Sequence, residues 1–292
     1  MRFSFYTRDI DRRTEWRVRE NLFDDLWKDE DTRVILFNKG KFLVKGKELA
    51  RVRATEVTSA QFRVFLGEDL RNGNKLIVQE VSDAAAVEAQ DYGTFRYLRE
   101  MANQLSEADQ HLAFETLAIT FWHKNHMYCP KCGEVLMVTH AGWAKECLAD
   151  ASEHFPRIDP AVIILIVNDS GELLLANNMK WPKDKYSFIA GYVDPGEPVE
   201  LAVIREAKEE VNIDLTDLEY LGNQPWSFPA SLMFAYKAKG TGDIKVDDIE
   251  IRHARWFKRD ELKEMIASKR IDPPGPLSVA HHMMTAWLND EI

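Results

Sequence analysis

The chain has 292 residues, of which 45% are hydrophobic and 29% charged, an ordinary composition for a globular protein with room for two domains. Its net charge of −10 argues against unspecific binding to nucleic acid, which depends on many lysine and arginine contacts with phosphate. The longest apolar run, residues 161–167, is far shorter than the roughly 20 residues that a membrane span needs. No apolar signal-peptide core follows the first methionine, so we expect a cytoplasmic protein that does not contact membranes.

The N-terminal part of the chain alternates short apolar segments with charged turns. Residues 32–36 and 41–44 flank Asn38-Lys39-Gly40, a pattern typical of a β-hairpin. Over residues 95–124 the apolar residues recur instead at helical spacing. The sequence therefore predicts an α+β domain over residues 1–125 that ends in helices, and it shows no identifiable chemistry there.

All three cysteines fall in the segment that follows, residues 126–157. Cys129 and Cys132 form a Cys-x-x-Cys knuckle with a glycine placed for the tight turn, and Cys147 lies nearby in the sequence. Three clustered thiols in a chain of this kind are typical of a zinc site rather than of a disulfide framework. The sequence therefore predicts a small zinc-ribbon-like segment with structural Zn²⁺.

The fourth zinc ligand is less well defined by the sequence. Asp150 has the place in the spacing where a fourth cysteine would stand, whereas His154 is chemically the better zinc ligand. A water is the third possibility. The alternative to all three is a segment that has lost its metal and is held together by packing alone.

A continuous apolar strand, residues 161–167, opens the C-terminal part of the chain. Residues 168–171 have turn composition, and residues 172–176 are the expected hairpin partner. Further along, Pro198 suits the first turn of a helix that continues with apolar residues on one face.

Three carboxylates converge on that helix, because side chains three and four residues apart share one face. Glu206, Glu209 and Glu210 have this spacing. Like charges gathered in this way are destabilising alone, and a hard divalent cation that prefers oxygen ligands would offset their repulsion. The simpler interpretation is a solvated acidic helix face.

The surrounding residues favour the metal site, because the whole stretch resembles the Nudix box. That pattern requires a glycine, a glutamate, an arginine and the glutamate group at fixed spacings, and it ends in a glycine that is Asn212 here. Asn tolerates the left-handed conformation at a helix end, so we expect this departure to be mild. The matching positions are Gly191, Glu197, Arg205, Glu206, Glu209 and Glu210.

The resemblance implies a catalytic Mg²⁺ or Mn²⁺ held against a diphosphate. By position, Glu206 and Glu210 are metal ligands and Glu209 is a ligand or the base. The backbone carbonyl of Ala190 and the carboxylate of Glu250 are further candidate ligands, the alternative for Glu250 being a surface acid.

A second signature, Gln-Pro-Trp-Ser-Phe-Pro-Ala-Ser, follows the box and resembles that of NADH pyrophosphatases, with serine where a proline is usual. Its prolines stiffen the loop, and its aromatic rings can lie against flat ligands. The alternative is a hydrophobic loop that fills the core. The resemblance implies substrate contacts from Gln224, Pro225, Trp226, Ser227, Phe228, Pro229, Ala230 and Ser231, and from Ala280 near the C-terminus.

The resemblance covers about residues 95–292 and implies an α+β multidomain protein. Its parts are a variable first domain, the zinc ribbon and, over residues 158–292, a Nudix α/β/α sandwich with a mixed sheet. The expected activity is hydrolysis of NADH or NAD⁺ to nicotinamide mononucleotide and AMP by a homodimer. The alternatives are removal of an NAD cap from RNA or hydrolysis of ADP-ribose on the same scaffold, and a non-catalytic sensor that binds NAD(H).

Overall fold

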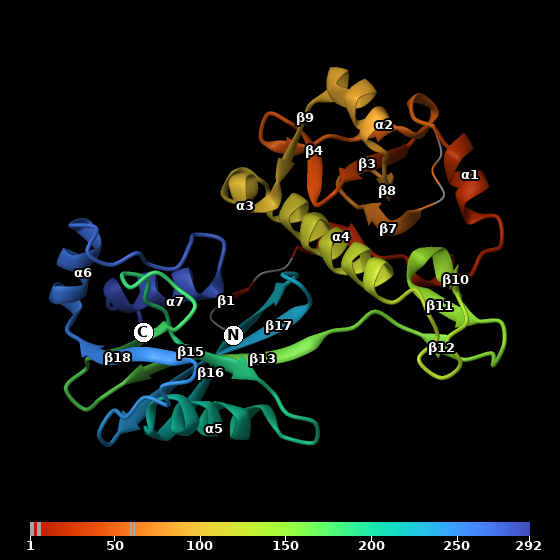
Figure 1. Ribbon diagram of the computed structural model, residues 1–292. Coiled ribbons are helices and arrows are strands. Elements are labelled where there is room, and N and C mark those ends of the chain that lie inside the picture. Colours follow the sequence, from red (N-terminus) through yellow and green to blue (C-terminus); the bar gives the residue numbers. More distant parts are fainter. Residues whose placement is uncertain (1–2, 5–6, 59, 61) are drawn as a thin grey trace. The chain divides into compact units, whose positions relative to one another are not determined.

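The computed structural model describes residues 3–4, 7–58, 60 and 62–292, and the chain divides into two compact units (Figure 1). Among the described helices, none is long and apolar enough to cross a membrane. The C-terminal unit comprises Ile158–Trp226, Ser231–Ile292 and the short strand at residues 3–4, whereas the N-terminal unit comprises the described residues of Tyr6–Arg157 together with Ser227–Ala230.

The C-terminal unit is built on a 7-stranded sheet in the order β1-β16-β17-β13-β14-β18, with β15 paired to β13. Its strands are β1 (Phe3–Ser4), β13 (Asp159–Val167), β14 (Leu173–Asn178), β15 (Ile189–Tyr192), β16 (Asp214–Trp226), β17 (Ser231–Thr241) and β18 (Ile251–Phe257), and its helices are α5 (Val199–Val211), α6 (Arg259–Ala267) and α7 (Val279–Leu288).

Strand β13 explains why this sheet has helices on both faces (Figure 1). Successive side chains of a strand point to opposite faces. Val162 and Ile164 pack in the core that includes α5, whereas Ile163 and Leu165 pack in the core that includes α6 and α7. A strand covered on both sides must be apolar throughout.

The predicted fold of this unit is confirmed. Strand β13 pairs parallel with β17 and antiparallel with β14, so the sheet is mixed. The pairing of Val167 with Leu173 closes the predicted hairpin across residues 168–171. With α5 on one face and α6 and α7 on the other, the unit is the predicted α/β/α sandwich.

The N-terminal unit has an 8-stranded sheet in the order β2-β7-β8-β3-β4-β5, with β6 paired to β3 and β9 to β4, and a separate 3-stranded sheet, β10-β11-β12. Its strands are β2 (Ile10–Asp11), β3 (Thr32–Asn38), β4 (Lys41–Lys45), β5 (Glu48–Leu49), β6 (Val52–Arg53), β7 (Arg63–Asp69), β8 (Asn74–Glu80), β9 (Thr94–Tyr97), β10 (Leu136–Thr139), β11 (Ala144–Cys147) and β12 (Glu153–His154), and its helices are α1 (Leu22–Lys28), α2 (Asp83–Glu88), α3 (Leu98–Met101) and α4 (Glu107–Asn125).

The sequence predictions for this unit are mostly confirmed. Strands β3 and β4 form the predicted hairpin, with Lys39 and Gly40 at positive φ in its turn. Helix α3 lies within the predicted helical region, and α4 ends one residue beyond it, at Asn125. The prediction was wrong at Phe95–Tyr97, because these residues pair with β4 as part of strand β9 instead of beginning a helix.

The 3-stranded sheet is attached to the end of α4 by a buried lysine. Lys145 in β11 is 3% exposed, and its ammonium group donates to the carbonyl oxygens of His123 and His126. Each of these carbonyls lies near the end of a helix, where backbone acceptors lack intrahelical partners. The contact therefore satisfies a buried charge and fixes the segment that carries the cysteines.

Candidate functional site

The acidic residues of the candidate site are carried by α5 and by the turn that precedes it. Helix α5 begins after Pro198 and ends before Asn212, whose φ of 58° lies in the left-handed region, as the sequence predicted. The helix packs through Ala202, Val203 and Ala207 on the core of the sheet. Its acidic face is therefore set by the burial of its apolar face.

Arg205 holds the turn and the helix together. Its guanidinium donates to both carboxylate oxygens of Glu197, each at 2.9 Å. It also donates to Glu206 at 2.8 Å, to Glu209 at 3.0 Å and to the carbonyl oxygen of Tyr192 at 2.8 Å. The hydrogen bonds that Arg205 donates to Glu197, and then those to Glu206 and Glu209, raise its pKa, so it stays a fixed cation.

Glu206 and Glu210 lie against the sheet and are almost fully buried. Glu210 is 6% exposed, and its Oε2 atom has no hydrogen-bond partner among the described residues. Burial, and after it the negative charges of Glu206 and Glu250, together raise the pKa of Glu210 to about 8. Burial also raises the pKa of Glu206. An unpaired buried carboxylate beside other acids fits a cation, because a positive charge would remove both costs.

Gly191 in β15 leaves room for the Glu206 carboxylate, because glycine has no Cβ atom. A Cβ atom at Gly191 would lie 2.0 Å from Cδ of Glu206, a separation that no pair of atoms tolerates. The sequence identified this glycine only as one position of the Nudix box. Ala190 is the adjacent residue of β15, so its carbonyl lies in the same short strand that Glu206 contacts.

Two further acids approach the cluster from the segment before β18. The charge of Glu250 contributes to the raised pKa values of both Glu206 and Glu210, as expected of a neighbour in the cluster. Asp247 was missed by the sequence analysis. Its N–H donates to the carbonyl oxygen of Glu210 at 3.2 Å, and its carboxylate accepts backbone N–H groups of Glu250 and Ile251. Asp247 thus holds the segment that presents Glu250.

Gln224 and Phe228, two residues of the second signature, make different kinds of contact. Gln224 is 2% exposed, donates to the carbonyl oxygen of Leu277 at 2.8 Å and accepts the N–H of Val279 at 2.6 Å. These bonds bring the residue before Ala280 to β16, and they occupy the amide that was expected to contact substrate. Phe228 packs in the N-terminal unit, edge-to-face with Phe114 and under the guanidinium of Arg99 at 4.3 Å.

The remaining residues of the signature lie at the end of β16, at the start of β17 and in the connection between these strands. Trp226 is the last residue of β16, and Ser231, which is 9% exposed, is the first of β17. The two residues are paired across the strands. The connection between them contains Ser227, Pro229 and Ala230.

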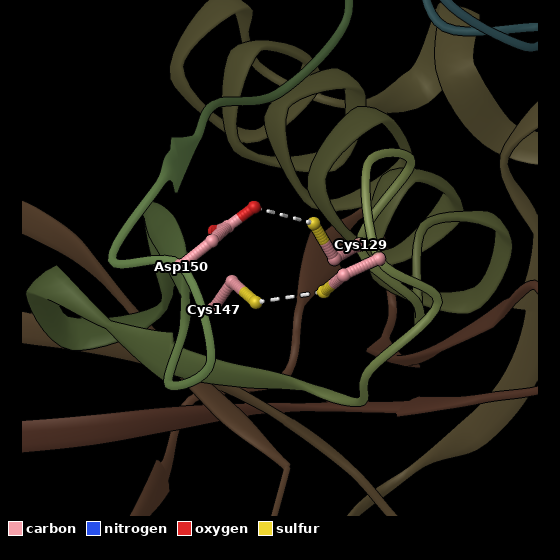
Figure 2. Close-up of side chains that lie close together, drawn as sticks. Cys129, Cys147 and Asp150 are labelled. Carbon is pink, nitrogen blue, oxygen red and sulfur yellow. Dashed lines mark hydrogen bonds between the residues drawn. The ribbon is translucent and has the colours of Figure 1, made fainter.

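The cysteine cluster gathers four possible metal ligands (Figure 2). One atom from each of Cys129, Cys132, Cys147 and Asp150 lies within 4.8 Å of the others. The Sγ atoms of Cys132 and Cys147 are 3.4 Å apart, and Sγ of Cys129 is 3.6 Å from Oδ2 of Asp150. No set of carboxylates around α5 is as tightly gathered among the described residues. The cluster could therefore bind a metal, as the sequence predicted for its three cysteines.

Two family models match the chain, and together they extend across both units. A NUDIX domain matches residues 157–275, and an NADH pyrophosphatase-like rudimentary NUDIX domain matches residues 31–122. The second match covers strands and helices in which the sequence analysis found no identifiable chemistry.

Similar proteins with curated names are called NAD-capped RNA hydrolases or NAD(P)H pyrophosphatases. An "NAD-capped RNA hydrolase NudC" of Mycobacterium bovis is 34% identical over 65% of this chain, and the aligned part spans 64% of that relative's length. The human "NAD-capped RNA hydrolase NUDT12" is 29% identical over 63% of this chain and 43% of its own. The mouse "NAD(P)H pyrophosphatase NUDT13, mitochondrial" is 34% identical over 81% of this chain and 70% of its own length. The chain therefore belongs to the NADH pyrophosphatase family of Nudix hydrolases.

Proposed function

We propose that this chain hydrolyses the diphosphate bond of NADH or NAD⁺, releasing reduced or oxidised nicotinamide mononucleotide and AMP. The observation that carries the proposal is Glu210, a buried carboxylate that lies among other acids and whose Oε2 atom has no hydrogen-bond partner in the described part of the chain. Such an arrangement is costly unless a cation and its ligand complete it. The substrate class is supported by the relatives named NAD(P)H pyrophosphatase and NAD-capped RNA hydrolase.

The proposed cation is Mg²⁺ or Mn²⁺, because all the candidate ligands are oxygen atoms. Glu206 and Glu210 would hold it, with the carbonyl of Ala190 and the carboxylate of Glu250 as further ligands and Glu209 as a ligand or the base. A divalent cation there would neutralise diphosphate oxygens and increase the acidity of water.

Arg205 and Glu209 would have separate roles in the reaction. Arg205 holds Glu206 and Glu209 in position through hydrogen bonds of 2.8 and 3.0 Å. Of Glu206, Glu209 and Glu210, Glu209 is the exposed one, with 61% of its side chain accessible, so water can reach its carboxylate. In the reaction, water attacks one phosphorus of the diphosphate and the bond from that phosphorus to the bridging oxygen breaks. The attacking water loses its proton to the base, and the departing phosphate keeps the bridging oxygen.

The substrate wall is proposed to come from residues 224–231 and Ala280. Gln224 would act indirectly, since its amide ties β16 to Leu277 and Val279. Trp226 and Phe228 have rings that suit a flat base or nicotinamide. The other proposed contacts are Pro225, Ser227, Pro229, Ala230 and Ser231.

Removal of an NAD cap from RNA is the second candidate, because the mycobacterial and human relatives described above are named for that activity. The bond that is cut would be the same, and only the group attached to the AMP half would differ. The net charge of −10 offers little general attraction to RNA.

The test is mass spectrometry of the products after purified protein is incubated with NADH, NAD⁺, ADP-ribose or NAD-capped RNA, with and without Mg²⁺ or Mn²⁺. Nicotinamide mononucleotide and AMP that form from the free dinucleotide only with metal would support the proposal. A rate on capped RNA far above that on NADH would favour cap removal. Binding of NADH without turnover of any substrate would instead indicate a sensor.

We also propose that the cysteine cluster holds structural Zn²⁺ and that the chain forms a homodimer. Three thiolates at this separation suit zinc, which takes four ligands in structural sites. Elemental analysis should give about one zinc per chain. Light scattering should give twice the chain mass of 33.7 kDa.

A further inference from the structure

We propose that the carboxylate of Asp150 is the fourth ligand of the metal in the cysteine cluster. The site would then bind zinc through three thiolates and one carboxylate oxygen. This inference rests on the zinc proposal above and names the ligand that completes the site. Four features of the segment support it.

The first feature is that the two halves of the cluster have the same backbone turn. The N–H of Gly133 donates to the carbonyl oxygen of Cys129 at 2.9 Å, and the N–H of Ala151 donates to that of Cys147 at 2.8 Å. In each turn the residue that follows the second ligand has positive φ, 80° at Gly133 and 56° at Ala151. By this correspondence Asp150 occupies in the second turn the place that Cys132 occupies in the first.

A second pair of hydrogen bonds extends the correspondence. The N–H of Cys129 donates to the carbonyl oxygen of Glu134 at 2.8 Å, and the N–H of Cys147 donates to that of Ser152 at 3.0 Å. Both bonds join residues five apart. The conformation of Ala151 is otherwise hard to explain, because an alanine in the left-handed region costs roughly 1–2 kcal/mol. A turn that must present Asp150 to the sulfur atoms accounts for it.

The third feature is the orientation of the Asp150 carboxylate (Figure 2). Its Oδ1 atom accepts the N–H of Ser152 at 2.9 Å and the hydroxyl of Ser152 at 2.5 Å. Its Oδ2 atom is turned toward the cysteines, 3.6 Å from Sγ of Cys129. One oxygen is therefore fixed by the protein and the other is presented as a single ligand atom, as suits a tetrahedral site.

The fourth feature is the position of His154, the competing ligand. Its Nε2 atom lies 3.0 Å from the hydroxyl oxygen of Ser152, and its ring lies 5.1 Å from that of His126. No nitrogen of His154 belongs to the group of ligand atoms within 4.8 Å. His154 thus supports Ser152, which in turn holds Asp150, in the way that outer partners orient metal ligands.

The test uses the full chain, produced with zinc or with Co²⁺, whose absorption spectrum reports the number of thiolate ligands. The variants are Asp150→Cys, Asp150→Ala and, as the matched control, His154→Gln, whose amide can still bond to Ser152. Metal content is measured by elemental analysis, zinc affinity by competition with a chelating dye, and folding by circular dichroism.

We expect Asp150→Cys to increase the thiolate-to-cobalt charge-transfer absorption per cobalt by about one third, because the number of thiolates rises from three to four. Asp150→Ala should weaken zinc binding by at least about tenfold. His154→Gln should leave the cobalt spectrum unchanged. Because Asp150→Cys keeps four ligands, it tests the proposal even if Asp150→Ala fails to fold.

Two other results would overturn the inference separately from the zinc proposal. An unchanged cobalt spectrum in Asp150→Cys would exclude Asp150 as a ligand while zinc binding stands, as would a spectrum altered by His154→Gln alone. A folded wild-type chain without zinc, or with Cys132 and Cys147 joined as a disulfide, would refute the zinc proposal itself.

Discussion

The carboxylate cluster on α5 (Glu206, Glu209 and Glu210) and the cysteine cluster are both sets of side chains that could bind a metal, but their possible ligand atoms are gathered to different degrees. Around the cysteines, four ligand atoms lie within 4.8 Å of one another. On α5 the acids are spread, and they range from Glu210, which is buried, to Glu209, which is exposed. A structural metal site is closed by protein ligands, whereas a catalytic one keeps positions for water and substrate. The contrast between the clusters matches that division of roles.

The largest effect should come from Glu210→Gln, which removes a carboxylate from the cluster on α5 and preserves the shape of the side chain. We expect the rate of NADH hydrolysis to fall by about 10³-fold, within the range for loss of a catalytic carboxylate. The zinc content of the cysteine cluster should not change, since that site lies in the other unit. Steady-state kinetics at saturating Mg²⁺ and elemental analysis measure both.

Glu264→Gln is the matched control, because Glu264 lies on α6 with 75% of its side chain exposed. Its rate should equal that of the wild type. If Glu210→Gln also retained a near-normal rate, the carboxylate cluster would not be the catalytic centre.

The stability of the cysteine-bearing segment and that of the carboxylate cluster should also change with pH in opposite directions. His123, beneath the cysteine-bearing segment, is 6% exposed, and burial lowers its pKa to about 4 from an ordinary value of 6.5. The unfolded chain therefore binds this proton more readily, so its share of stability is present above pH 6.5 and lost as the pH falls toward 4. The loss amounts to about 3 kcal/mol at most. Glu210 has its pKa raised from 4.5 to about 8, so it destabilises the metal-free fold increasingly as the pH rises from 4.5 to 8.

Substituting His123→Gln tests the acid side of this contrast. Glutamine can still donate to the carbonyl oxygen of Gly142, which lies 2.7 Å from Nε2 of His123, but it does not titrate. We expect the drop in melting temperature between pH 7 and pH 5 to become smaller than in the wild type. His253→Gln, at an exposed position, should keep the full drop. An equal drop in the two variants would show that His123 is not responsible.

A smaller loss of activity is expected from Gly191→Ala, which disturbs only the carboxylate cluster on α5. The new Cβ would lie 2.0 Å from Cδ of Glu206, so the carboxylate must move. A side-chain end can move at modest cost to stability, but Glu206 would leave the position in which Arg205 holds it. Activity should fall by about 10²-fold with a melting temperature near that of the wild type. Unchanged kinetics would show that the site tolerates a displaced Glu206.

The features that could be predicted from the sequence are those that depend on nearby residues. The spacing of Glu206 and Glu210 fixes a shared helix face, and the left-handed end of the helix at Asn212 follows from a local preference. The hairpin of β3 and β4 is likewise encoded in its turn.

The features that could not be predicted depend on partners distant in the sequence. Residues of strand β9 have a helical pattern but pair with β4 across some fifty positions. The bonds of Gln224 to Leu277 and Val279, and the contact of Gly191 with Glu206, exist only once the sheet has formed. Tertiary contacts of this kind override local preference.

The smallest effects compare the two left-handed residues that shape the clusters. Ala151 has φ 56° and Asn212 has φ 58°, so glycine would relieve strain at either position. Asparagine tolerates this conformation better, and the side chain of Asn212 also donates to the carbonyl oxygen of Asp243 at 3.2 Å. We expect Ala151→Gly to stabilise the protein by about 1 kcal/mol and Asn212→Gly to change stability by less than about 0.5 kcal/mol. Denaturant unfolding of the two variants measures the difference. If Ala151→Gly gave no gain in stability, the turn at Ala151 would not be strained, and one of the supports for Asp150 as a ligand would be removed.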